Sequence, residues 1–342
     1  MNNASRKRVL DALSHRIPDR LPVDLWAEPE VKEKLLHYFG VSEWNRVLDI
    51  LEIDVRIVEP INPPLIYESK TLRRNHWGER WQKTEYGWLH TVGALHNACT
   101  MEELESYAWP SCDDNDYETL GRQIDEASGR AILYGFADVW ERAALVIGLE
   151  NMMIQMADNP KFVHYIVRKF TDYYKEDWRR AIEASGGRID ILLQLADLGT
   201  QLAPLISHEM FREYIKPYVT ELFDVAKKAG IQCMFHTCGS AASFIPDLIE
   251  TGMDILNPVQ VSAANMSLSV LKRDFGSKIA FHGAIDEQET LSVATPEQVR
   301  EKVLEARRIL GEGGGYILCS THLLQDDISI ENILALYDTS LR

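Results

Sequence analysis

The 342-residue sequence has few cysteines, a deficit of basic residues and no long apolar segment. Its five cysteines are odd in number and sparse, which argues against a disulfide framework and favours a reducing, cytoplasmic location. No run of 18 apolar residues occurs, and the N-terminus lacks the apolar core of a signal peptide, so we expect no membrane-spanning helix or secretory leader. With 36 Lys and Arg against 52 Asp and Glu, the net charge of −16 disfavours nucleic acid and anionic membranes as partners.

Nucleotide-binding motifs are also missing. No G-x-G-x-x-G follows an expected strand and no Walker sequence occurs, which weakens the alternative of a doubly wound open sheet. The Gly313-Gly-Gly315 run precedes its strand, so it is typical of a helix-to-strand turn. The sequence does contain 46% hydrophobic residues, enough for a large packed core.

Apolar runs of strand length alternate with helical patterns along the chain. The eight expected strands are 21–26, 54–59, 131–136, 188–196, the run that ends at His236, 254–257, 279–281 and 316–318. Eight strand–helix units predict an α/β protein, a (β/α)8 TIM barrel forming one domain over residues 1–342.

One long segment departs from this alternation. Residues 60–110 hold Trp77, Trp81 and Trp88 among charges and glycines, which predicts a β-ribbon or lid near the carboxyl-terminal mouth of the barrel. The tryptophans either seal this insertion onto the barrel or form an aromatic wall for a planar ligand.

The run Ile231–Ser240 carries the strongest chemical signal. It reads Ile-Gln-Cys-Met-Phe-His-Thr-Cys-Gly-Ser, so His236 and Cys238 stand at period-two spacing where a strand ends. Imidazole and thiolate on one face can share a Zn²⁺ ion. Two ligands do not complete a site, and the alternative is a hydrogen-bonded histidine beside a buried cysteine.

Active sites of TIM barrels lie at the carboxyl ends of the strands, so polar residues there are candidates. These residues are Asp24, Asp138, Glu141, Asp197, His236, Cys238, Asn257, Gln260, His282, Asp286, Cys319 and His322.

Several segments resemble the uroporphyrinogen decarboxylase superfamily. They are Tyr214-Ile-Lys-Pro-Tyr218, His236-Thr-Cys-Gly239, Ile255-Leu-Asn-Pro-Val-Gln260, Gly283-Ala-Ile-Asp286, and the stretch from Gly315 through Glu331-Asn332. The resemblance covers most of the chain and independently implies a (β/α)8 barrel. Decarboxylases of this superfamily are expected to carry an arginine-rich Met-Arg-Gln-Ala-Gly-Arg motif, whereas this chain has Leu25-Trp-Ala-Glu-Pro-Glu30.

The chain is more similar to the zinc methyltransferase branch, which is related to methylcobalamin:coenzyme M methyltransferases and uses corrinoid cofactors. That resemblance implies that His236 and Cys238 bind zinc. In the branch, the third ligand looks to be a cysteine nine residues before a Glu-Asn pair, and here that position is His322. Cys319 is the less favoured alternative, because its side chain is expected to face the core.

A histidine at this position resembles the O-demethylases. The resemblance therefore implies a methyltransferase that moves a methyl group from a methoxylated aromatic compound to the Co(I) corrinoid of a partner corrinoid protein. Zn²⁺ and the partner's corrinoid (cobalamin) are the implied cofactors. Alternatives are transfer from a methylcorrinoid to a thiol or to tetrahydrofolate, a decarboxylase of uroporphyrinogen type, and an inert binding protein.

Roles follow for the remaining candidates. Asp197 and Glu141 are expected to be catalytic, by exchanging a proton with the leaving phenolate or completing the metal shell. The alternative is that each carboxylate pairs with an arginine. The expected substrate-binding residues are Trp26, Trp140, Asn257, Gln260 and His282. Asn257, Gln260 and His282 have a structural alternative, because amides and histidines at strand ends often bond loop backbone.

Overall fold

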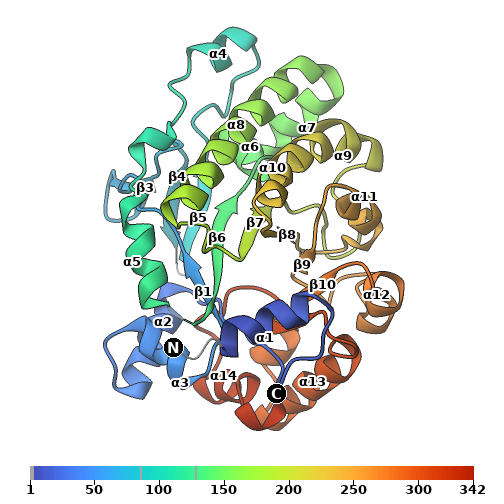
Figure 1. Cartoon of the computed structure of the whole chain (residues 1–342). Helices are drawn as coiled ribbons and strands as arrows, with labels where there is room; N and C mark the ends of the chain where they lie inside the picture. The colour runs from blue at the N-terminus through green and yellow to red at the C-terminus, as the bar shows by residue number, and fades with distance from the viewer. Residues whose placement is uncertain (1–3, 85–86, 128) are drawn as a thin grey trace.

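Seven parallel strands form a curled sheet at the centre of the computed structural model, which describes residues 4–84, 87–127 and 129–342 (Figure 1). In spatial order they are β1 (Val55–Val58), β6 (Ala131–Ala137), β7 (Ile191–Leu195), β8 (Gln232–His236), β9 (Ile255–Asn257), β10 (Ala280–Ile285) and β11 (Tyr316–Ser320). From β6 to β11, strands that are consecutive along the chain are also neighbours in the sheet, and helices separate them along the chain. The connections are therefore parallel crossovers. The predicted α/β, TIM-barrel-like class is confirmed.

The N-terminal segment joins the two edges of this sheet. Val23 bridges Leu318 of β11 in parallel, and Asp24 N donates to Leu318 O at 2.9 Å. On its other side, Asp54 N donates to Val23 O at 2.9 Å, directly before β1. The expected strand over residues 21–26 therefore has the predicted place but only isolated bridges. Pro22 provides one physical reason, because it has no N–H to donate to a ladder.

Helices surround the sheet, as Figure 1 shows for α8, α10 and α13. The described helices are α1 (Ala4–Leu13), α2 (Pro29–Phe39), α3 (Trp44–Ile50), α4 (Met101–Ser106), α5 (Glu118–Glu126), α6 (Glu141–Ile147), α7 (Leu149–Asp158), α8 (Pro160–Ala184), α9 (His208–Tyr214), α10 (Lys216–Lys228), α11 (Ile245–Glu250), α12 (Leu268–Phe275), α13 (Pro296–Leu310) and α14 (Ile330–Leu336), with short turns η1 (Cys112–Asp114), η2 (Ala242–Phe244), η3 (Glu287–Leu291) and η4 (Thr339–Leu341). Within the described residues, no helix is both long and apolar enough to span a bilayer.

One helix expected to be continuous is broken, and a second divides where its proline predicts a kink or break. The pattern over residues 140–157 divides at Gly148, whose φ of 88° lies outside the helical region. The pattern over residues 208–229 divides at Ile215, because Pro217 lacks an N–H and its ring clashes with the preceding turn.

The inward faces of the strands pack into one apolar cluster. Its members include Leu133, Leu193 and Met234 from three successive strands, and α1 contributes Val9 and Leu13. Burying each such side chain contributes about 1.5–3 kcal/mol. Apolar residues therefore fill the barrel interior, and polar groups gather where the strands end.

The insertion leaves the barrel after the carboxyl end of β1 and forms a four-stranded antiparallel sheet. Its strands are β2 (Ile66–Tyr67), β3 (Leu72–Arg74), β4 (Arg80–Thr84) and β5 (Gly87–Val92). Trp77 is buried with its ring centroid 4.7 Å from those of Phe170 and Tyr173 on α8. This tryptophan attaches the ribbon to the helical layer. Trp88 instead lies under Arg73 of the ribbon, 4.2 Å from ring centroid to guanidinium.

Candidate functional site

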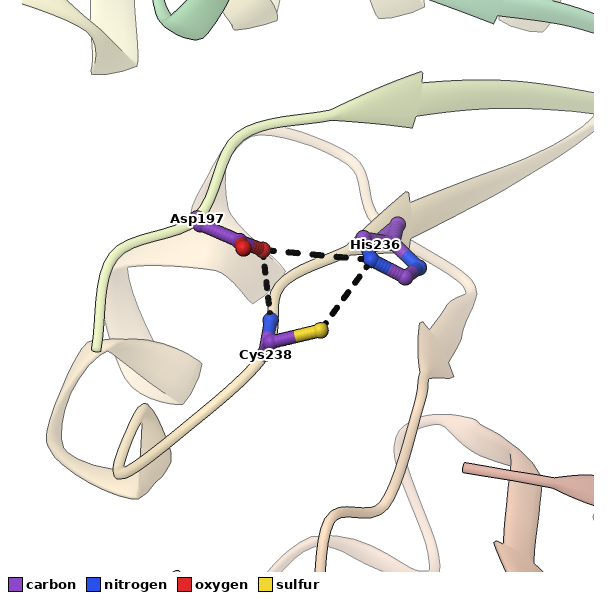
Figure 2. Close-up of side chains that lie close together, drawn as sticks. All are labelled: Asp197, His236 and Cys238. Atoms are coloured by element: carbon purple, nitrogen blue, oxygen red, sulfur yellow. Dashed lines mark hydrogen bonds and ion pairs between the residues drawn. The ribbon is translucent and has the colours of Figure 1, made fainter. Parts of the chain in front are cut away.

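Asp197, His236 and Cys238 converge at the carboxyl ends of β7 and β8 (Figure 2). Leu195 stands opposite His236 in the parallel register, so the residues that follow each strand enter the same loop region. His236 Nε2 lies 3.3 Å from Cys238 Sγ and 3.8 Å from Asp197 Oδ1. The three ligand atoms lie within 4.8 Å of one another, so this group could hold a metal ion.

The loop that carries Cys238 depends on a glycine. Gly239 has a φ of 79°, and a Cβ at this position would lie 2.5 Å from Gly199 O. Cys238 N donates to Asp197 Oδ1 at 2.8 Å, and Gly239 N donates to Gln260 Oε1 at 2.6 Å. Backbone contacts therefore hold the thiol close to the histidine and the carboxylate.

The donor set fits zinc. Imidazole nitrogen, thiolate sulfur and carboxylate oxygen are all common Zn²⁺ ligands. His236 Nδ1 lies 2.5 Å from Asn257 Oδ1. Because an amide oxygen only accepts, the proton is on Nδ1 and the Nε2 lone pair remains for a metal.

Burial controls the ionisation of this group. It lowers the pKa of His236, opposed by the Asp197 carboxylate, and it raises the pKa of the Cys238 thiol, assisted by Asp197. A bound divalent cation would lower the pKa of the Cys238 thiol, against burial and Asp197, because a coordinating thiol loses its proton.

Three further carboxyl groups lie at the strand ends. Burial, followed by the nearby Asp197, raises the pKa of Glu141 to about 7, and Glu141 Oε2 accepts from Asp197 N at 3.3 Å. Burial and the Glu141 charge raise the pKa of Asp138, whose Oδ1 has no hydrogen-bond partner among the described residues. Burial and Asp286 raise the pKa of Glu287 to about 8. Glu287 was not a candidate from sequence, although it directly follows the candidate Asp286.

The two expected third ligands lie outside the compact group. His322 is partly exposed, and its Nδ1 lies 3.8 Å from Glu287 Oε1. It is close enough to His236 for its charge to lower the pKa of that ring. Cys319 belongs to the apolar cluster inside the barrel, where burial raises the pKa of its thiol. The ligand role of His322 stays a prediction.

The expected substrate-binding residues separate into two sets. Trp26, Asn257 and His282 surround His236: the indole of Trp26 stacks near its ring at 6.2 Å between centroids, and Asn257 lies between the two histidines. Gln260 bonds loop backbone, and Trp140 is buried directly before Glu141 with no hydrogen-bond partner for Nε1 among the described residues.

Two cavities share the wall formed by Phe136. One, of about 380 Å³, is lined by residues including Asp24, Trp26 and Phe136. The other, of about 370 Å³, lies under the ribbon and includes Trp77 and Arg142. Phe136 and Glu59 line both cavities, so the two adjoin. Sequence reasoning missed Phe136 and Glu59, although both stand at the ends of expected strands.

A family model and one solved structure agree with this fold. A model of the uroporphyrinogen decarboxylase (URO-D) family matches residues 96–341. A solved methyltransferase from Methanosarcina mazei has a TM-score of 0.71 at 15% identity, covering 97% of this chain and 96% of that one. D-psicose 3-epimerase from Clostridium cellulolyticum H10 has a TM-score of 0.44 at 10% identity, covering 93% of this chain and 88% of that one. No curated protein matches the sequence.

Because the family model spans most of the chain, including β6 to β11 and the Asp197–His236–Cys238 group, the protein belongs to the uroporphyrinogen decarboxylase family.

Proposed function

We propose that this protein is a zinc-dependent methyltransferase that transfers a methyl group from a methoxylated aromatic compound to the corrinoid of a partner protein. The observation that carries the proposal is the convergence of His236, Cys238 and Asp197 at the carboxyl end of the barrel. The full-length likeness to a methyltransferase structure supports it.

Decarboxylation of a porphyrinogen is disfavoured by charge. A polycarboxylate needs cations at the mouth, but the segment 25–30 contains none. Arg142 is the arginine beside the acid cluster, and its guanidinium is already paired with Glu79 at 2.8 Å. Asp24 and Asp197 would repel an anionic substrate.

Zinc, when held by this group, would supply Lewis acidity that polarises the ether oxygen of the donor. In this reaction the O–CH3 bond would break with its electron pair left on the oxygen, and the methyl group would be transferred to the reduced corrinoid of the partner. Glu141 holds a proton near neutral pH because its pKa is about 7, and it delivers that proton to the phenolate. Trp26 and Phe136 offer aromatic faces to the ring of the donor.

The acid-rich mouth further favours an uncharged donor. A guaiacol-type phenol carries no carboxylate, whereas a vanillate-type acid would bring a like charge toward Asp197. We expect the uncharged donor to have the lower KM by roughly tenfold, which corresponds to about 1.4 kcal/mol of repulsion.

The test mixes purified protein, zinc, reduced corrinoid protein and guaiacol, and follows the optical change from reduced to methylated corrinoid. Cys238→Ala should abolish the reaction, while Cys233→Ala, which changes a buried thiol on the same strand outside the group, should retain it. Demethylation of methylcorrinoid by a thiol or by tetrahydrofolate, with every aryl ether inert, would replace this proposal with the acceptor-side reaction.

A further inference from the structure

We infer that Asp24, His282 and Asn257 form a positioning chain that keeps the proton of His236 on Nδ1 and so selects Nε2 as its metal-binding atom. This inference rests on the metal site of the proposed function. It gives Asn257 and His282 a role behind the metal ligand, in place of the substrate contacts expected from sequence.

Adjacent strands bring the four side chains into one row. His236 stands opposite Asn257 in the register of β8 and β9. Ala280 stands opposite Ile255, so His282 comes beside Asn257 two residues further along each strand. Asp24 reaches the row from the segment that bridges β11.

Short polar contacts connect the row from end to end. His236 Nδ1 lies 2.5 Å from Asn257 Oδ1, and Asn257 Nδ2 lies 2.6 Å from His282 Nδ1. His282 Nε2 lies 3.0 Å from Asp24 Oδ2. Each side chain in the row therefore contacts the next through its own polar atoms.

The carboxylate at the far end fixes the direction of every donor. Asp24 accepts from Leu25 N and from Trp26 Nε1, both at 2.8 Å, and both of these groups only donate. Asp24 therefore also accepts the Nε2 proton of His282, which leaves His282 Nδ1 as an acceptor.

The same logic continues to the metal ligand. Asn257 must direct its NH2 group toward His282 Nδ1, so its oxygen faces His236. That oxygen accepts the Nδ1 proton of His236. The lone pair of His236 then lies on Nε2, the atom that faces Cys238 and Asp197 in Figure 2.

Burial makes this order hard to exchange. The exposed fractions of Asp24, Asn257 and His282 are 1%, 2% and 0%. The indole of Trp26 covers the row, with centroids 5.4 Å from His282 and 6.2 Å from His236. Water is therefore a poor substitute for any partner, and reversing one hydrogen bond requires reversing all of them.

The experiment determines the tautomer of His236 in metal-free, ¹⁵N-histidine-labelled protein by long-range ¹H–¹⁵N correlation, and measures zinc affinity by chelator competition. The unchanged protein should show only the Nδ1–H form. Asp24→Asn places an amide NH2 among three donors, and His282→Phe lets Asn257 rotate. Both variants should show the Nδ1–H and Nε2–H forms together, and zinc affinity should fall about 10- to 100-fold.

Asn257→Asp separates positioning from general packing. A carboxylate accepts the Nδ1 proton of His236, and His282 takes up a second proton on Nδ1 because it then lies between two carboxylates. This variant should therefore retain the single Nδ1–H form of His236, although it alters the same buried row. Asp190→Asn is a matched control, because Asp190 is a buried carboxylate paired with Arg6 outside the row. It should change neither the tautomer nor zinc affinity.

A single Nδ1–H form with unchanged zinc affinity in both Asp24→Asn and His282→Phe would overturn the inference. Should Asp24→Asn fail to fold, His282→Phe carries the same test. Neither measurement uses methyl transfer, so a protein that is inactive toward every donor would contradict the proposed function and leave the positioning result intact.

Discussion

Asp197 Oδ1 lies 3.8 Å from His236 Nε2 and accepts a hydrogen bond from the backbone N of Cys238. A carboxylate therefore stands next to the His-x-Cys pair, at the position where the sequence favoured His322. Because the neighbouring strands β7 and β8 both end in this loop region, their parallel pairing is enough to bring Asp197 beside His236 and Cys238.

The first prediction concerns this third ligand. Asp197→Ala should lower zinc affinity by about 10- to 100-fold or more, because it removes one of three closely spaced ligand atoms. Cys319→Ala should retain zinc and cost about 1–2 kcal/mol of stability through lost packing. Elemental analysis after dialysis and thermal unfolding provide the two measurements. Full zinc occupancy in Asp197→Ala with loss in His322→Ala would restore the ligand set expected from sequence.

The second prediction uses the ionisation of Glu141. Its pKa of about 7 means that the proton donor is present below pH 7 and is lost as the pH rises through that value. Single-turnover methyl transfer should therefore decline above pH 7. Glu141→Gln should react about 10²- to 10⁴-fold more slowly and lack that decline. Glu150→Gln, an exposed change on α7, is the matched control. An unchanged pH profile in Glu141→Gln would assign the proton to another group.

The sequence predicted much of the barrel, and individual helices show why. The bounds of α12 and α13 are marked in the sequence, because Ser267 and Thr295 precede these helices and Gly276 and Gly311 follow them. The break at Gly148 was missed, since apolar periodicity continues across it, whereas Pro217 predicted the break beside Ile215. The insertion's strands and its attachment through Trp77 depend on contacts with α8, which no local pattern encodes.

The sequence predicted only part of the candidate site. Period-two spacing placed His236 and Cys238 on one face, and strand ends identified Asp197 and Glu141. The contact of His282 with Asp24 joins residues 258 positions apart, so only the closed order of strands reveals it. The pKa of Glu287 is raised mainly by burial, which depends on how the loops cover it.

The third prediction concerns a buried acid away from the metal group. Burial raises the pKa of Asp177 to about 6, against hydrogen bonds from Tyr117 and Tyr134 that lower it. The folded protein therefore holds a proton that the unfolded chain, with a value of 3.8, has released. Stability from this group should fall by about 1–3 kcal/mol as the pH rises from about 4 to 7.

Chemical unfolding at a series of pH values measures this effect. The free energy of unfolding of the unchanged protein, minus that of Asp177→Asn, should decrease across the window. Asp172→Asn alters an exposed carboxylate on the same helix and should give a flat difference. A difference for Asp177→Asn that rises with pH would show that this carboxyl is stabilised in its charged form.

The last prediction tests the turn that carries the thiol. A methyl group at Gly239 would lie 2.5 Å from Gly199 O, and the backbone there has a φ of 79°. Gly239→Ala must therefore shift the turn that follows Cys238, and should cost about 1–3 kcal/mol from the strained backbone plus the clash. Gly186→Ala separates the two causes, because Gly186 has a φ of 63° and no atom lies within 4 Å of the point that its Cβ would occupy. It should show the backbone cost of about 1 kcal/mol alone and retain full zinc affinity.

Thermal unfolding measures the stability of the two alanine variants, and chelator competition measures their zinc affinity. Equal zinc affinity in the two alanine variants would mean that the close approach of Gly239 to Gly199 does not position Cys238.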